Sequence, residues 1–280
     1  MLSVIFGIST ALCWGTADFI GGSASRRAGA YRMTLGTVAC GLLFLLPAAF
    51  IMQEVPLSRH GWLLGMLAGT FDSVGILLLY MSMTAGRLSL AAPVSALTSA
   101  ALPVVYGMVT LGIPELPVIA GLILALASVW LVSRGGEAGQ QGRIRCSDLY
   151  LPLLSGSCLG IFLVLMHTNS HTAMFWPMIA VRCGGVITLL CLSTAFMFRV
   201  QSVAAFPWRL IFLTGLLDVG GNYFYILAGQ MGRMDVAAVL SSLFPGTTVF
   251  LAWLILKEHI SRLQLVGILL ALCAIVLFAL

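Results

Sequence analysis

Ten long apolar runs, separated by short polar connections, make up almost the whole chain. A helix needs about 20 mainly apolar residues to cross a bilayer, and each run is close to that length. None shows the polar and apolar alternation of a membrane β-barrel strand, and in lipid a spanning backbone must satisfy its own hydrogen bonds. The pattern therefore predicts an all-α integral membrane protein with ten transmembrane helices. Their approximate ranges are 2–23, 31–51, 61–84, 89–111, 117–133, 149–168, 175–198, 208–230, 235–256 and 263–280.

The composition agrees with a multi-pass protein of the cell membrane, inner or plasma. Of 280 residues, 60% are hydrophobic and 8% charged, whereas a soluble domain carries about 25% charged residues. The net charge of +5 does not indicate a nucleic-acid partner, because the basic residues lie between the apolar runs and set topology. The seven cysteines lack metal-site spacing and are interpreted as small packing residues. His167 and His171 are four apart but have no third ligand, so no metal or cofactor is expected.

The second half of the chain repeats much of the first at an offset of 146 positions. Aligning residues 61–107 with 207–253 without a gap gives twelve identities. Matching leucines follow from shared apolar composition, but matching polar and glycine positions do not. Those pairs are Gly69/Gly215, Asp72/Asp218, Gly75/Gly221, Gly86/Gly232, Arg87/Arg233 and Ser95/Ser241. We infer an internal duplication.

The duplication divides the chain into two units of five helices. The first covers 1–133, a polar linker rich in Gly, Gln and Arg covers 134–148, and the second unit covers 149–280. Since five is odd, the second unit enters the membrane from the opposite side. Inverted repeats of this kind build many secondary transporters, whose substrate site lies near the midplane between the halves. The expected fold is thus two inverted five-helix repeats.

Two segments carry a family pattern. They are ALCWGTADFIGG from Ala11 to Gly22 and the segment from Leu240 to Phe278, which contains Pro245, Lys257-Glu258, Gln264 and Gly267. On these residues the chain resembles the EamA-domain family of the drug/metabolite transporter (DMT) superfamily over essentially its whole length. The resemblance implies two EamA-type repeats and export of metabolites, amino acids or drugs.

The orientation of the chain stays open. Eleven of the 14 Lys and Arg residues lie in the odd-numbered connections and two in the even-numbered ones. Positive residues favour the cytoplasm, so the count predicts that both termini lie outside. The family resemblance implies that they lie inside.

Three aspartates fall within the apolar runs, where a carboxylate costs about 2.5–3.5 kcal/mol on insertion scales. Asp18 lies four residues after Trp14, on the same helix face. A buried acid there suits a proton or a cationic substrate, and distant relatives by resemblance, the small multidrug transporters, carry such an acid in their first helix. The alternative is an interfacial pair of Asp18 with Arg26 or Arg27.

The other two acids are the duplicated pair Asp72 and Asp218. Asn222 follows Asp218 by one helical turn, and Tyr223 offers an aromatic wall for an organic substrate. Because residue 76 is Ile where residue 222 is Asn, the site is expected to be weighted toward the second half. The alternative is that these acids only tie neighbouring helices together.

Two further features are candidates for the site. Pro93 and Pro103 in the fourth run, and Pro245 and Gly246 in the ninth, predict broken or kinked helices, and matched discontinuous helices point to a transport site. Ser95 and Ser241 are then expected to line a cavity. Last, Arg182 interrupts the seventh run and is expected either to extend to the interface or to bind an anion.

These patterns predict a secondary-active exporter of a small metabolite, amino acid or drug, working by alternating access with proton antiport. Motifs for nucleotide binding, nucleophilic catalysis or zinc catalysis are absent from the sequence, so no enzyme activity and no direct use of ATP are expected. Helices one, three, four, six, eight and nine would line the cavity. Its partners would be the substrate, protons and lipid, and the chain would be a monomer, with a homodimer left open. The alternatives are a uniporter or uptake permease, and a membrane protein that does not transport.

Overall fold

The computed structural model describes residues 1–84, 88–134, 146–170, 173–196, 207–256 and 261–279. The expected all-helical fold is confirmed over this part of the chain. Its helices are α1 (Leu2–Ala28), α2 (Ala30–Ile51), α3 (Arg59–Thr84), α4 (Leu88–Leu111), α5 (Leu116–Arg134), α6 (Cys146–Asn169), α7 (Phe175–Phe196), α8 (Trp208–Gln230), α9 (Met234–Ser241), α10 (Phe244–Leu256) and α11 (Arg262–Ala279).

Each of the ten predicted spans corresponds to helix in the structure, the ninth being divided into α9 and α10. Eight segments of the described chain are long and apolar enough to cross a membrane, counting α9 and α10 together, and α5 and α11 are shorter apolar helices. Large apolar side chains are exposed along the outer faces of the bundle, for example Leu43, Phe50, Leu63 and Val109. In a membrane protein such faces meet lipid. Most of the polar linker predicted at 134–148 lies outside the described residues.

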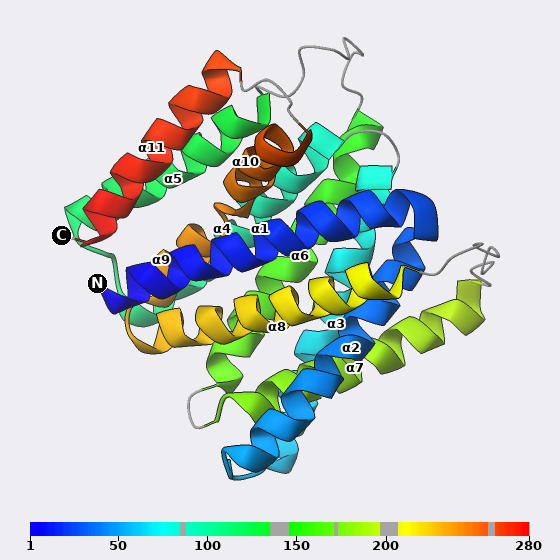
Figure 1. Cartoon of the computed structure of the whole chain (residues 1–280). Helices are drawn as coiled ribbons and strands as arrows, with labels where there is room; N and C mark the ends of the chain where they lie inside the picture. Colours follow the sequence, from blue (N-terminus) through cyan, green and yellow to red (C-terminus); the bar gives the residue numbers. More distant parts are fainter. Residues whose placement is uncertain (85–87, 135–145, 171–172, 197–206, 257–260, 280) are drawn as a thin grey trace.

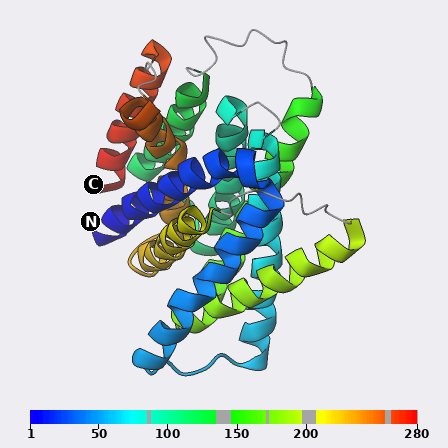
Figure 2. The same cartoon turned by 45° about the vertical axis from the view of Figure 1, so that its right-hand side comes forward.

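Helices of each repeat pack against helices of the other repeat, in corresponding pairs. In the first repeat, α3 packs against α6 and α7, and in the second repeat α8 packs in the same way against α1 and α2. Likewise α4 packs against α6, as α9 and α10 pack against α1, and α5 pairs with α11. The α5–α11 pair lies side by side at one edge of the bundle in both views (Figure 1, Figure 2). Since each contact in one repeat has a counterpart in the other, the centre of the molecule is built from both.

Glycines allow these helices to cross closely, as small residues do between helices in lipid. A Cβ atom on Gly69 of α3 would overlap the backbone of Val181 in α7, and one on Gly184 of α7 would overlap the backbone of Met66. On the other side, a Cβ on Gly15 of α1 would overlap the carbonyl of Phe244 in α10. Backbone atoms cannot move aside as side chains do, so these positions fix the helix crossings around the centre.

Among the described residues, a span that is broken into two helices occurs in the second repeat and not in the first. Pro245 has no N–H, and its ring clashes with the carbonyl four residues earlier. That residue, Ser241, is the last of α9, and α10 begins at Phe244. By contrast α4 is one helix through the positions of Pro93 and Pro103. A break matching that of the second repeat is therefore absent from α4, and a kink at Pro93 or Pro103 stays a prediction. The carbonyl of Ser99, which Pro103 excludes from helical bonding, lies beside Gly160 of α6, where a larger residue would not fit.

Candidate functional site

A cavity of about 60 Å³ lies between the repeats. Its lining comes from α1, α3, α4, α6, α8 and α10, which are the six spans expected from the sequence, and from α2 in addition. The lining residues are Trp14, Ala17, Asp18, Thr37, Asp72, Ile76, Leu79, Tyr80, Ser99, Leu159, Phe162, Leu163, Thr214, Asp218 and Phe244.

The three predicted aspartates all line this cavity. Asp72 is 3% exposed and Asp218 is 7% exposed, so both carboxylates are removed from bulk solvent. Asp18, expected to share a helix face with Trp14, lines the cavity together with it. The alternative partners of Asp18, Arg26 and Arg27, lie two turns further along at the end of α1, and no ion pair joins Asp18 to any described residue. Three acids that are far apart in sequence thus line the same cavity.

Arg182 lies in the protein interior. Its Nη1 atom is 3.4 Å from Oδ2 of Asp72, and its Nη2 atom is 2.5 Å from Oδ2 of Asp218. The first contact has hydrogen-bond geometry, whereas the second is a close ion pair whose atoms are not aligned as a hydrogen bond. Arg182 is 0% exposed, so the expectation that it extends to the interface is wrong. The physical reason is that two acids from α3 and α8 compensate its charge, and that Gly41 of α2 leaves room for its Nε atom.

Several predicted residues lie away from the cavity lining. The hydroxyl of Ser95 bonds with that of Ser155, which donates to the carbonyl of Gly75, so Ser95 ties α4 to α6 and α3. The hydroxyl of Ser241 donates to carbonyls within α9. Neither lines this cavity, contrary to expectation, whereas Ser99, one turn after Ser95, does. Pro103, Pro245 and Gly246 are also outside the lining of this cavity, and the side chain of Pro93 is outside the described part of the structure.

The expected neighbours of Asp218 also differ from the prediction. Tyr223 stacks on Phe175 at a centroid distance of 5.9 Å and does not line the cavity. Asn222 is 2% exposed, and its Oδ1 atom has no hydrogen-bond partner among the described residues. The aromatic wall is formed instead by Trp14, Tyr80, Phe162 and Phe244. The site therefore draws its aromatic groups from both repeats, and the expected weighting toward the second half is wrong for this wall.

Two hydroxyls that sequence reasoning missed lie in the cavity. Thr37 of α2 and Thr214 of α8 both line it, and each is 1% exposed or less. Neither Oγ1 atom has a hydrogen-bond partner in the described part of the chain. A buried polar group left unsatisfied costs about 1–3 kcal/mol, so these hydroxyls suit a ligand or water. No sequence signal distinguishes them, because threonine is common in membrane helices and Thr37 has no polar counterpart in the duplication.

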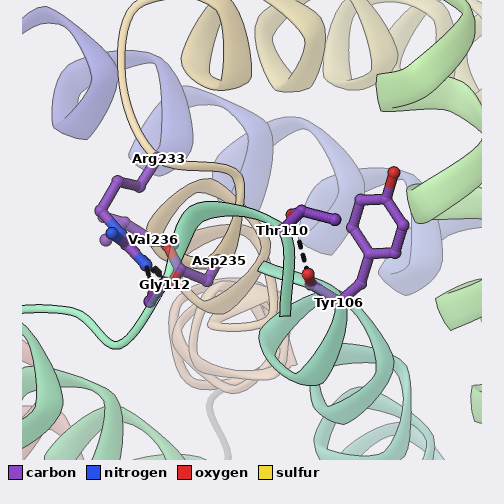
Figure 3. Close-up of polar contacts among 6 residues, drawn as sticks. All are labelled: Tyr106, Thr110, Gly112, Arg233, Asp235 and Val236. Atoms are coloured by element: carbon purple, nitrogen blue, oxygen red, sulfur yellow. Dashed lines mark hydrogen bonds and ion pairs between the residues drawn. The ribbon is translucent and has the colours of Figure 1, made fainter. Parts of the chain in front are cut away.

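One end of the bundle, which contains Ser3, Gly112 and Gln230 and is called here the N-terminal end, is held by polar bridges between the repeats. Arg233 follows α8 and pairs with Asp235 at 2.8 Å. Its Nη2 atom also donates to the carbonyl of Gly112, after α4, at 3.0 Å (Figure 3). Asp235 is 0% exposed, a buried acid that the sequence patterns do not indicate.

Further bridges lie at the same end. The Ser3 hydroxyl donates to the carbonyl of Ala228, and Asn169 donates to the carbonyl of Gly61. Glu54 accepts hydrogen bonds from the backbone N–H groups at residues 174, 175 and 176, where α7 begins. A carboxylate at a helix N-terminus is favourable because of the helix dipole. This end is thus closed by contacts from each repeat to the other.

No group of three or more metal-binding side chains occurs among the described residues. His171, one of the histidine pair considered above, lies outside that part of the chain.

Comparisons with known proteins give a family and a fold. The sequence model of the EamA-like transporter family matches residues 1–134 and 148–280. A solved structure, described only as "Crystal structure of protein", is similar with a TM-score of 0.76 at 15% sequence identity. The match covers 99% of this chain and 96% of the other, and at this identity it shows the fold alone. The search of curated proteins gives no match.

Proposed function

The chain belongs to the EamA-like transporter family, and from this membership we propose that it exports a small organic solute by proton antiport. The family consists of membrane transporters and not of enzymes, so the chain is a multi-pass integral membrane transporter. The direction of transport, its coupling to protons and the position of the site are our proposal.

The observation that carries the proposal is the set of acids in the central cavity. Asp18, Asp72 and Asp218 come from three helices and both repeats, and each carboxylate is costly at membrane depth. Asp72 and Asp218 contact Arg182, but no ion pair compensates Asp18 within the described chain. An acid without a fixed counter-ion is the group that a proton and a substrate can occupy in turn. Competition for Asp18 couples export of the solute to entry of a proton.

The closed N-terminal end supports alternating access. Bridges such as Arg233 to Gly112 and Glu54 to the start of α7 join the repeats there. The cavity of about 60 Å³ is smaller than the roughly 300–1,000 Å³ of pockets that hold drug-sized ligands. We infer that the cavity is too small for such a solute in this conformation. The solute would enter after the repeats move apart at one end. The break between α9 and α10, which places Phe244 at the cavity, would act as a hinge for that movement.

Two other functions remain as alternatives within the same test. A uniporter or uptake permease would use the cavity without a proton, and a membrane protein that does not transport would leave the acids as purely structural groups. The buried pairs of Asp72 and Asp218 with Arg182 favour a structural role for those two acids. Asp18 distinguishes the alternatives, because a structural role gives no reason for a carboxylate without a counter-ion in a cavity.

The experiment is an export screen followed by vesicle transport. Cells with and without the protein are compared for resistance to toxic amino acids and drugs, and any solute found is measured in everted vesicles with and without a pH gradient. We expect accumulation that depends on the gradient in the wild type and is lost in Asp18→Asn. Transport that ignores the gradient and is unchanged in Asp18→Asn would contradict proton antiport.

A further inference from the structure

The charges at the cavity do not balance. Among the described residues, Asp18, Asp72 and Asp218 line it, and the cation Arg182 contacts Asp72 and Asp218. With all four groups ionised, three carboxylates against one guanidinium give a formal charge of −2, and protonation of Asp18 still leaves −1. A cationic ligand would therefore be attracted to this cavity and an anionic one repelled.

Arg182 does not reverse this preference. It is fully buried and is not among the residues that line the cavity. Its two ion pairs are with acids, one at each Nη atom. Its Nε atom has no hydrogen-bond partner among the described residues and lies beside Gly41 of α2. A ligand carboxylate would have to displace Asp72 or Asp218 to reach it, and would do so beside the remaining acids. The arginine is thus a fixed counter-charge and not an anion receptor.

The two cavity hydroxyls differ from the ordinary threonines of this protein. Thr34, three residues before Thr37 on α2, is 0% exposed and donates to the carbonyl of Ala30 at 3.0 Å. This local bond is the common arrangement for threonine within a helix. Thr37 and Thr214 are as deeply buried, yet their Oγ1 atoms lack a partner in the described chain, and both residues line the cavity. Because buried polar groups are nearly always bonded, these oxygens are available to a ligand.

The remaining walls are apolar or aromatic. Trp14, Tyr80, Phe162 and Phe244 surround the same space. Aromatic faces pack against apolar groups and also attract cations through their π electrons. The lining thus combines negatively charged carboxylates with an apolar and aromatic surface for the hydrocarbon part of a ligand.

We propose that the cavity binds the protonated amino group of a small organic amine, with Asp18 as counter-ion and Thr37 and Thr214 as hydrogen-bond partners. An ammonium group has three N–H donors and no acceptor, and one carboxylate together with two hydroxyls supplies three acceptor groups. The aromatic wall holds the apolar body. This inference rests on the proposed transport function and names its substrate class.

A series of four compounds with one phenylethyl body tests the charge preference. Phenethylamine is cationic, phenylalanine zwitterionic, 3-phenylpropionate anionic and 2-phenylethanol neutral, and each is measured for flux through the full chain in liposomes. Because the neutral alcohol crosses lipid unaided, flux is scored as the excess over protein-free liposomes. We expect protein-dependent flux of the amine at least tenfold above that of the other three. Faster flux of the zwitterion or the anion, or flux of none, would overturn the assignment. If the transport function itself is wrong, the export screen would find no solute whose export depends on Asp18.

Variants of the two hydroxyls test their role. Thr37→Val and Thr214→Val keep the shape and remove the hydroxyl, and we expect each to weaken apparent affinity for phenethylamine about tenfold, the effect of losing a hydrogen bond to a charged group. Thr37→Ser and Thr214→Ser should retain wild-type affinity because they keep the hydroxyl. Thr34→Val, on the same helix but bonded to its own backbone, is the matched control and should bind as wild type. Wild-type affinity in both cavity Val variants would contradict the assignment, and so would equal losses in Thr34→Val.

Discussion

Replacing Arg182 by Gln removes the cation that contacts Asp72 and Asp218 at the centre of the molecule. At the observed separation of 3.4 Å from Asp72, two unit charges attract by roughly 5 kcal/mol at an effective dielectric constant of about 20. Desolvation of the buried groups offsets much of this gain. Removing one member of a buried pair nevertheless destabilises a protein by about 3–5 kcal/mol, because the remaining charge is left uncompensated.

The expected loss is large enough to measure by thermal unfolding in detergent, followed by helical circular dichroism. A loss of about 1 kcal/mol lowers the unfolding midpoint by about 2–4 °C in chains of about 150–250 residues. Arg182→Gln should therefore lower the midpoint by about 6–20 °C. Adding Asp218→Asn to Arg182→Gln should recover part of that loss, because one uncompensated buried carboxylate is then removed. The double mutant should therefore be more stable than the sum of the single changes predicts.

Arg209→Gln is the matched control, since Arg209 is exposed and lies 5.3 Å over the ring of Trp208. Its midpoint should stay within about 2 °C of the wild type, a change below about 1 kcal/mol. If Arg182→Gln behaves like Arg209→Gln, and if the double mutant is simply additive, the central ion pairs do not stabilise the fold and the reasoning is refuted.

Three other predictions follow from single contacts. Gly184→Ala should lower the unfolding midpoint by several degrees, because the new Cβ overlaps the backbone of Met66 where α3 crosses α7. Asp235→Asn should weaken the bridge of Arg233 and shift transporters toward a conformation open at the N-terminal end, seen as faster thiol labelling of a cysteine placed at that end. Glu54→Gln should reduce stability by about 1 kcal/mol, because charged acceptors at a helix N-terminus stabilise it by roughly that amount.

Each of these predictions has a clear opposite result. Gly220→Ala is the control for Gly184→Ala, since its Cβ would meet only the sulfur of Cys13 at an ordinary 3.7 Å; equal midpoints in the two variants would contradict the role of the α3–α7 crossing. Unchanged labelling in Asp235→Asn would show that the Arg233 bridge does not hold the end closed. An unfolding midpoint of Glu54→Gln equal to that of the wild type would show that the cap at α7 contributes nothing.

Much of the fold follows from the sequence because lipid restricts what a chain can do. Ten apolar runs must be helices, and the matching Asp72 and Asp218 indicate a duplication that predicts corresponding positions for the two acids. Pro245 ended α9 at Ser241, as a missing N–H and a ring clash require. At Pro103, by contrast, α4 continues, and the freed carbonyl of Ser99 lies beside Gly160 of α6. A sequence does not show which helix will lie next to a proline.

The site was only partly predictable for a similar reason. The acids stood out because a charge in an apolar run is costly, wherever the run packs. Arg182 is equally conspicuous, but its partners come from α3 and α8, so local reasoning predicts only an interfacial or an anion-binding position and not this buried ion pair. Thr37 and Tyr80 gave no signal, since their role depends on facing a cavity formed by helices distant in sequence.

The most direct test of the central claim is proton movement driven by solute in liposomes that contain the purified protein and a trapped pH dye. We predict that phenethylamine, or the solute identified in the export screen, drives a proton flux in the wild type and in Glu115→Gln, which alters an exposed acid at the start of α5. Because the neutral form of an amine crosses lipid and binds a proton inside, proton flux is scored as the excess over protein-free liposomes, and the same solute should drive none in Asp18→Asn. Equal proton flux in Asp18→Asn and the wild type, or solute flux without any proton flux, would contradict the claim that the central cavity exchanges a proton for substrate.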